Sequence, residues 1–269
     1  MKISVCGRGG SGKSTLVTLL ARSAQLKSLK VLVVDSDESN SGLFRMLGFD
    51  KPPAPLMELV GGKKEVQLKL REALSSDESE SGMSILTQDT LIMDDIPAKY
   101  ISGKDGLRLA CIGKIHQSLE GCACPMGVLS REFLKKLILK EDEIAIVDLE
   151  AGVEHFGRGV ETSIDHVLVV VEPSFESLDL AERLKSLTGG IKKNLWAVLN
   201  KIDSERLSSR LEGKLKNRDI PVIGTIPYDS TIFEACLEGR AIKPEKATHA
   251  ARKILDFLVS KRQRVNPER

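Results

Sequence analysis

The segment from Cys6 to Thr15, CGRGGSGKST, constrains this chain more than any other. Its residues from Gly7 to Ser14 fit G-x-x-x-x-G-K-[ST], between the apolar run Ile3–Val5 and leucines at helical spacing. Glycines allow a tight turn whose N–H groups point at phosphate oxygens, and the following helix directs its positive end to the same place. The segment therefore predicts a phosphate-binding loop inside a strand–loop–helix unit.

Each position of this loop has an expected role. Lys13 is expected to reach the β and γ phosphates of a nucleoside triphosphate, and the Ser14 hydroxyl to ligate Mg²⁺. The other nucleotide-binding positions of the loop are Gly9, Gly10, Ser11, Gly12 and Thr15.

Short apolar runs alternate with helical patterns along most of the chain. The runs are Ile3–Val5, Val31–Val34, Ile144–Val147, Val167–Val171, Leu195–Leu199 and Val222–Thr225. The helical patterns are Lys13–Gln25, Arg131–Leu139, Leu178–Thr188, Ser204–Lys216, Thr231–Leu237 and Ala247–Lys261. Runs without a polar alternation are typical of strands buried on both faces. The order predicts an α/β fold, with a doubly wound, mostly parallel sheet flanked by helices.

This rhythm breaks in residues 48–127. Three prolines between Pro52 and Pro55 oppose a regular element, and Ser75–Gly82 is polar enough to predict an exposed loop. Leu107–Ile112 could form one more strand. We expect one domain over residues 1–269, with this irregular insertion inside it.

Charge and hydropathy argue against a nucleic-acid-binding protein and against a membrane-spanning one. Forty basic and 38 acidic residues give a net charge of +2, which is not the basic excess of nucleic-acid-binding proteins. No apolar run approaches the roughly 20 residues of a membrane span, and the chain begins with a core strand rather than a signal peptide. We expect a cytoplasmic protein whose five cysteines are thiols or metal ligands rather than disulfides.

Carboxylates follow two of the predicted strands. Asp35 and Asp37 come after Val31–Val34, and Asp148 comes after Ile144–Val147. The carboxyl ends of parallel strands form the crevice in which open α/β sheets bind ligands. Asp35 and Asp148 are candidates for holding Mg²⁺, directly or through water, and Asp37 for orienting the attacking water. The alternative is a loop carboxylate that caps the next helix.

Asn200-Lys201-Ile202-Asp203 follows the strand Leu195–Leu199. Asn200 can donate to and accept from a purine edge. The N-K-x-D pattern also reads guanine in GTPases, so the residues alone leave adenine and guanine open.

Cys122 and Cys124 form a C-x-C pair. Two thiolates are too few for a soft divalent ion, but the same pair from two subunits would supply four. Tetrahedral sulfur suits Zn²⁺ and square-planar sulfur suits Ni²⁺. The alternative is two ordinary loop cysteines. The other three cysteines, Cys6, Cys111 and Cys236, are expected to be packed in the core.

The loop with Arg8 near its start resembles the deviant Walker A motif, K-G-G-x-G-K-[ST], of the MinD, ParA and nitrogenase-iron-protein group. This resemblance implies a dimeric ATPase, in which the early basic residue reaches the partner's phosphates; here Arg8 replaces the usual lysine. Within the group the chain is most similar to CooC-type ATPases, which mature nickel carbon monoxide dehydrogenase. That similarity rests on the loop, Asp35-x-Asp37, residues 148–159, Ile226-Pro227-Tyr228 and the C-x-C pair.

The resemblance implies further properties. Asn200 and the loop at Pro227 would hold adenine, which favours ATP and ADP over guanine nucleotides. A homodimer would gather Ni²⁺ (or Zn²⁺) through Cys122 and Cys124 and assist its insertion into carbon monoxide dehydrogenase. Glu150 stands where this family has a small residue, so the behaviour of the adjacent switch segment is open.

Two other functions stay open at this stage. A spatial organiser like MinD or ParA would need a lipid-binding last helix or a basic DNA-binding surface; the last helix ends in Lys261-Arg262-Gln263-Arg264. An iron–sulfur scaffold or electron donor could also use four cysteines across a dimer, but such reductases space their cysteines widely.

Overall fold

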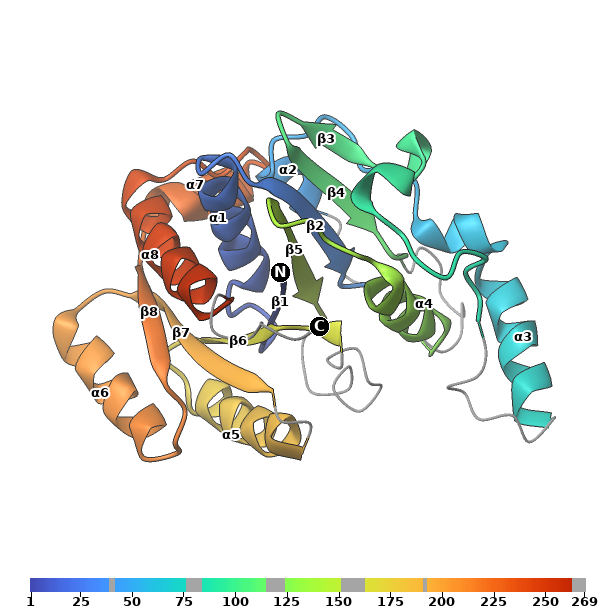
Figure 1. Ribbon diagram of the computed structural model, residues 1–269. Helices are drawn as coiled ribbons and strands as arrows, with labels where there is room; N and C mark the ends of the chain where they lie inside the picture. Colours follow the sequence, from blue (N-terminus) through green and yellow to red (C-terminus); the bar gives the residue numbers. More distant parts are fainter. Residues whose placement is uncertain (39–41, 76–83, 115–123, 151–162, 191–192, 263–269) are drawn as a thin grey trace.

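The computed structural model describes residues 1–38, 42–75, 84–114, 124–150, 163–190 and 193–262. Its described part holds an eight-stranded sheet in the order β3-β4-β2-β5-β1-β6-β7-β8 (Figure 1). The strands are β1 (Lys2–Gly7), β2 (Lys30–Ser36), β3 (Ser102–Lys104), β4 (Leu107–Cys111), β5 (Glu143–Leu149), β6 (His166–Val171), β7 (Asn194–Ile202) and β8 (Val222–Pro227). Every pairing is parallel except that of β3 with β4, which confirms the predicted fold class.

Helices cover both faces of this sheet. They are α1 (Lys13–Gln25), α2 (Leu43–Met46), α3 (Lys63–Ser75), α4 (Cys124–Lys136), α5 (Phe175–Gly190), α6 (Glu205–Lys216), α7 (Ser230–Leu237) and α8 (Glu245–Arg262), with 3-10 turns at Leu56–Val60, Met93–Asp95 and Ala98–Tyr100. Buried side chains of α1, α2, α7 and α8 form one core; those of the 3-10 turns, α3, α4, α5 and α6 belong to the other. Within β2, Leu32 and Val34 face the second core and Val31 and Val33 the first.

The strand order reverses beside β1. From β1 the chain crosses to β2 on one side, and after β5 it crosses to β6 on the other (Figure 1). Such a reversal opens a crevice at the carboxyl ends of the strands. The predicted phosphate loop, which follows β1 directly, lies at this point.

The region predicted to be irregular contains more structure than expected. Lys63–Ser75 forms the helix α3, in which Val66 is fully buried and Leu70 packs against the core. This helix was missed although Val66, Leu70 and Leu74 recur at helical spacing, because the prolines before it and the polar loop after it led us to assign the whole region as irregular. Ser102–Lys104 pairs with β4 as an antiparallel hairpin. Ser75 ends α3, and the rest of the predicted loop lies outside the described residues.

Two helix predictions need correction. The helix expected at Arg131–Leu139 begins already at Cys124 and ends at Lys136. Cys236 on α7 is exposed, although the core was predicted for it. Only one side of this short helix is packed, through Ala235 and Ile232, so that Phe233 and Leu237 stay 65% and 77% exposed.

The last helix, α8, is a core helix. Ala251, Ile254, Leu255 and Leu258 are fully buried where α8 packs on α1 and β8. A Cβ at Gly224 of β8 would lie 2.4 Å from Ile254, so the close contact requires glycine. Among the described helices, none has the length and apolarity to cross a membrane.

Truncating this packing should destabilise the protein. We expect Leu255→Ala to lower the free energy of unfolding by about 2–5 kcal/mol, through lost burial and the cavity left behind. Lys253→Ala, on the exposed side of the same helix, should change it by less than about 0.5 kcal/mol. Urea unfolding of both variants measures the difference; similar midpoints for the two would show that α8 is not part of the core.

Candidate functional site

The loop from Gly7 to Gly12 connects the buried strand β1 to α1. Gly12 takes φ 95°, a left-handed conformation that favours glycine, and its carbonyl accepts from Leu16 N at 2.9 Å to begin α1. Arg8 O accepts from Ser11 N at 3.1 Å, which closes the turn. Lys13, the first helical residue, is buried at the base of the loop. The segment has the strand–loop–helix context that the motif requires.

Asn200 packs against the same loop from the end of β7. Its amide nitrogen donates to Ser11 O at 2.7 Å, and the side chain is buried. A Cβ on Gly12 would lie 2.1 Å from that nitrogen. Asn200 therefore fixes the loop backbone in this structure, and its expected contact with a purine stays a prediction.

Ser14 and Asp148 meet at the carboxyl ends of β1 and β5. Ser14 Oγ donates to Asp148 Oδ2 at 2.6 Å. Asp148 Oδ1 is buried and has no hydrogen-bond partner among the residues that the structure describes. Burial raises the pKa of Asp148 to about 7, and the nearby Asp35 adds to the rise. An unpartnered buried carboxylate oxygen beside a hydroxyl fits Mg²⁺, which takes hard oxygen ligands and adds compensating charge.

Asp35 lies beside Asp148 because the two are register partners of neighbouring parallel strands. Its Oδ1 accepts from Asp37 N at 3.2 Å, and its Oδ2 lies 2.7 Å from Lys114 Nζ. Burial raises the pKa of Asp35, while the Lys114 ammonium opposes the rise. The predicted Asp35, Asp37 and Asp148 are thus brought together, but both oxygens of Asp35 already have partners.

Sequence reasoning missed Lys114. Its ammonium bonds Asp35 and also the backbone carbonyl of Asp37, and its side chain is only 13% exposed. The available signal was a lysine three residues after the end of the buried strand β4, which pairs with the strand that carries Asp35.

A second charged group surrounds Arg8 at the mouth of the loop. The Arg8 guanidinium is half exposed and lies 3.5 Å from Glu172, at the end of β6. Lys201 Nζ donates to Glu172 and to Gly10 O, each at 2.7 Å. Glu172 was also missed, and Lys201 was noted only as part of the N-K-x-D pattern; together they tie the outer loop to β6 and β7.

The remaining predicted nucleotide residues lie around this centre. Gly9 and Gly10 are exposed, and Thr15 is half-buried on α1. Pro227 ends β8, and Tyr228 N donates to Ile202 O at 2.8 Å, which brings the ends of β7 and β8 together. Pro227 therefore lies on the same edge of the sheet as Asn200.

One cysteine of the C-x-C pair lies within the described residues. Cys122 lies outside the described residues, and Cys124 is the first residue of α4. In the described ranges no cluster of three or more acidic, histidine or cysteine side chains could hold a metal by itself. Cys6 and Cys111 are buried as predicted. Burial and the neighbouring Asp35 raise the pKa of the Cys111 thiol to about 12, so it stays protonated.

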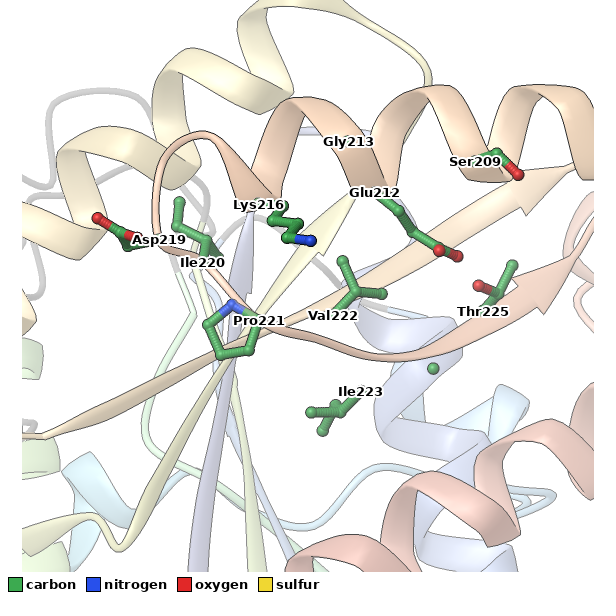
Figure 2. Close-up of a pocket in the computed structure, with 11 residues that line it drawn as sticks. Ser209, Glu212, Gly213, Lys216, Asp219, Ile220, Pro221, Val222, Ile223 and Thr225 are labelled. Carbon is green, nitrogen blue, oxygen red and sulfur yellow. The ribbon is translucent and has the colours of Figure 1, made fainter.

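A separate open cleft of about 910 Å³ lies between α6 and the edge strand β8. Figure 2 shows Glu212, Lys216 and Val222 among its lining residues. It shares no lining residue with the phosphate loop or with the carboxylates. We assign no role in nucleotide chemistry to this cleft.

Gly12 offers a steric test of the loop. Gly12→Ala should abolish nucleotide binding, because its Cβ would collide with Asn200, which would disturb the loop. Gly62→Ala is the matched control, since Gly62 has φ 91° and open space around its Cβ. Both variants carry backbone strain, of about 1–2 kcal/mol. Calorimetric titration with Mg·ATP compares them; equal affinities would contradict the role of Gly12.

Asp148 offers a pH test. The usual carboxyl pKa of the unfolded chain is near 4, and the folded value is about 7, so the folded state binds the proton more tightly. The free energy of unfolding should therefore fall as pH rises from about 4 to 7. Asp148→Asn removes this loss, so its melting temperature relative to wild type should rise between pH 5 and pH 8. Thermal unfolding without metal or nucleotide measures this; an offset independent of pH would refute it.

Comparison with known proteins agrees with this geometry. Residues 3–242 match the family described as the CobQ/CobB/MinD/ParA nucleotide binding domain. An uncharacterised ATP-binding protein of Methanocaldococcus jannaschii is 43% identical over 245 residues, which are 91% of this chain and 95% of that protein. The carbon monoxide dehydrogenase accessory protein CooC of Rhodospirillum rubrum is 32% identical over 236 residues, 87% of this chain and 89% of that protein.

Solved structures show the same fold. The septum site-determining protein MinD of Pyrococcus horikoshii, in complex with Mg-ADP, matches with a TM-score of 0.66 and 20% identity, over 99% of both chains. The loop geometry and these matches together establish the family: the chain belongs to the CobQ/CobB/MinD/ParA nucleotide-binding family of P-loop proteins.

Proposed function

We propose that this protein is an ATPase whose nucleotide-driven dimerisation assembles a metal site and assists nickel insertion into a carbon monoxide dehydrogenase. The observation that carries the ATPase part is the ordered loop with Lys13 at its base and the Ser14–Asp148 pair beside it. The metal part is supported by the C-x-C pair and by 32% identity to CooC, a carbon monoxide dehydrogenase accessory protein.

The roles proposed at the nucleotide follow from position. Lys13 and the loop N–H groups would neutralise the phosphates, while Ser14 and Asp148 would hold Mg²⁺. Asp37, buried beside them, would orient the attacking water. The Asn200 amide would have to shift from Ser11 O, or share that bond, to read adenine beside Pro227.

Arg8 supports the proposal of a dimer. Its side chain is half exposed at the mouth of the loop, so it is free to meet a phosphate supplied by a second subunit. Among the described residues, the guanidinium makes a single hydrogen-bonded ion pair, the long 3.5 Å one with Glu172. Exposed ion pairs of this kind contribute little free energy, so exchange for a phosphate contact is inexpensive.

The metal is a cargo in this proposal. Cys122 and Cys124 from each of two subunits would present four thiolates on the two-fold axis, with Ni²⁺ or Zn²⁺ between them. ATP binding would gather the four cysteines, and hydrolysis would separate them and release the metal to the client enzyme. The work would take place in the cytoplasm, without nucleic acid.

A role in spatial organisation, as in MinD or ParA, remains the second candidate function. The fold similarity to MinD favours it as much as it favours the first, because 20% identity carries the fold alone. Against it, the buried apolar side chains of α8 pack against α1 and β8 and are therefore not available to lipid. An iron–sulfur scaffold is a third possibility, and bound iron with visible absorption after anaerobic purification would support it.

Metal analysis with sizing tests the proposal. With Mg²⁺ and a non-hydrolysable ATP analogue, wild type should elute as a dimer and bind one Ni²⁺ per two chains. Cys122→Ala should still dimerise but lose the nickel. Cys236→Ala is the matched control, because it removes an exposed thiol outside the C-x-C pair and should bind nickel as wild type does. Unchanged nickel stoichiometry in Cys122→Ala would rule out this metal site.

A further inference from the structure

The acidic cluster of Asp35, Asp37 and Asp148 places three carboxyl groups in a buried part of the fold, where their negative charges are poorly solvated. The three residues are 2%, 6% and 0% exposed. Asp35 and Asp37 each raise the pKa of Asp148, which shows that the three charges act on one another. Buried charges of one sign require nearby cations. Among the described residues two lysines act on this cluster, Lys13 from the loop and Lys114 from the segment after β4.

The two lysines have different tasks. Lys13 belongs to the phosphate loop and is expected to bind the nucleotide. Lys114 makes its contacts within the protein, because its ammonium bonds Asp35 Oδ2 and the backbone carbonyl of Asp37. With an ammonium on its Oδ2 and Asp37 N on its Oδ1, Asp35 is held on both sides.

These contacts fix the backbone at Asp37. Both backbone polar groups of Asp37 are hydrogen-bonded, since its N–H donates to Asp35 and its carbonyl accepts from Lys114. Lys114 thus helps to fix the backbone from which the Asp37 side chain projects, and it does so from the segment after β4, which contains no predicted site residue among those described.

We propose that Lys114 is a positioning residue of the nucleotide site: it holds Asp37 in place for hydrolysis and supplies the cation of the acidic cluster before Mg·ATP arrives. This inference rests on the proposed ATPase function and adds a residue to it. It has two measurable consequences. Without the ammonium, Asp37 should be misplaced, and the more negative surroundings of Ser14 and Asp148 should attract free divalent metal more strongly.

The kinetic consequence is a change in kcat rather than in KM. Lys114→Met keeps the length of the side chain without its charge, and should lower kcat by about 10–100-fold, as expected for a displaced catalytic group. The KM for ATP should stay within about threefold, because Lys13 and the loop still bind the phosphates. Lys114→Arg keeps the cation and should recover most of the loss.

The metal consequence does not require turnover. Mn²⁺, which takes the same oxygen ligands as Mg²⁺, can be titrated by electron paramagnetic resonance in the absence of nucleotide. Lys114→Met should bind Mn²⁺ about tenfold more tightly than wild type, since one fewer cation competes for the carboxylates. Lys114→Arg should resemble wild type.

Lys136 provides the matched control. It forms a 2.8 Å ion pair with Glu132 on α4 and is as little exposed as Lys114, 13% in both cases. Lys136→Met should cost similar stability and leave kcat, KM and Mn²⁺ affinity unchanged. If Lys114→Met does not fold, Lys114→Gln, which keeps a hydrogen bond without the charge, replaces it in both measurements.

The outcomes separate the two proposals. Wild-type kcat in Lys114→Met, or a Mn²⁺ affinity of Lys114→Met equal to that of wild type, would overturn the role of Lys114. If wild type itself does not hydrolyse ATP, the proposed ATPase function fails, and the Mn²⁺ titration alone then decides whether Lys114 is the cation of the cluster. If Lys136→Met changed kcat and Mn²⁺ affinity as much as Lys114→Met does, both effects would be explained by general destabilisation of the protein.

Discussion

The parallel register of β2 with β5 is the constraint on which the site depends. It sets Asp35 opposite Asp148, and the pairing of β5 with β1 brings Asp148 beside the loop that carries Ser14. Both faces of these strands are buried by helices, and their charged residues lie at or next to the strand ends. Carboxylates that emerge there are surrounded by apolar layers and retain their charge only with cations near them.

Much of this arrangement was predictable from the chain. Lys13 lies in a strand–loop–helix context, and an apolar run precedes each aspartate. Ordinary crossovers between parallel strands then bring Asp35 and Asp148 to the edge of the sheet at which Ser14 lies. Each of those inferences uses residues close in sequence or a rule of strand order. The helix α3 was missed although Val66, Leu70 and Leu74 show a helical period, because the flanking prolines and polar loop outweighed that period in the interpretation.

The residues that were missed share a different property. Lys114, Glu172 and Lys201 act through contacts between elements far apart in sequence. Lys114 and Glu172 belong to no predicted motif, and the N-K-x-D pattern that contains Lys201 points to a nucleotide base rather than to Glu172. Their partners are fixed only when β4, β6 and β7 take their places in the sheet. The exposure of Cys236 has the same origin, since a period of apolar residues on α7 does not tell which side the sheet will cover.

The charges of the site explain why metal and nucleotide should enter together. Three carboxylates face two ammonium groups, and a triphosphate adds further negative charge near the same strand ends. Two like charges about 4 Å apart repel by about 4 kcal/mol at an effective dielectric constant of 20, so bare ATP meets an unfavourable field beyond the loop. Mg²⁺ reverses this, because it is attracted both to the phosphates and to the unpartnered oxygen of Asp148. Asp148 offers an oxygen to the metal, while Lys114 holds the neighbouring Asp35. The site is therefore suited to the Mg·ATP complex rather than to Mg²⁺ or ATP alone.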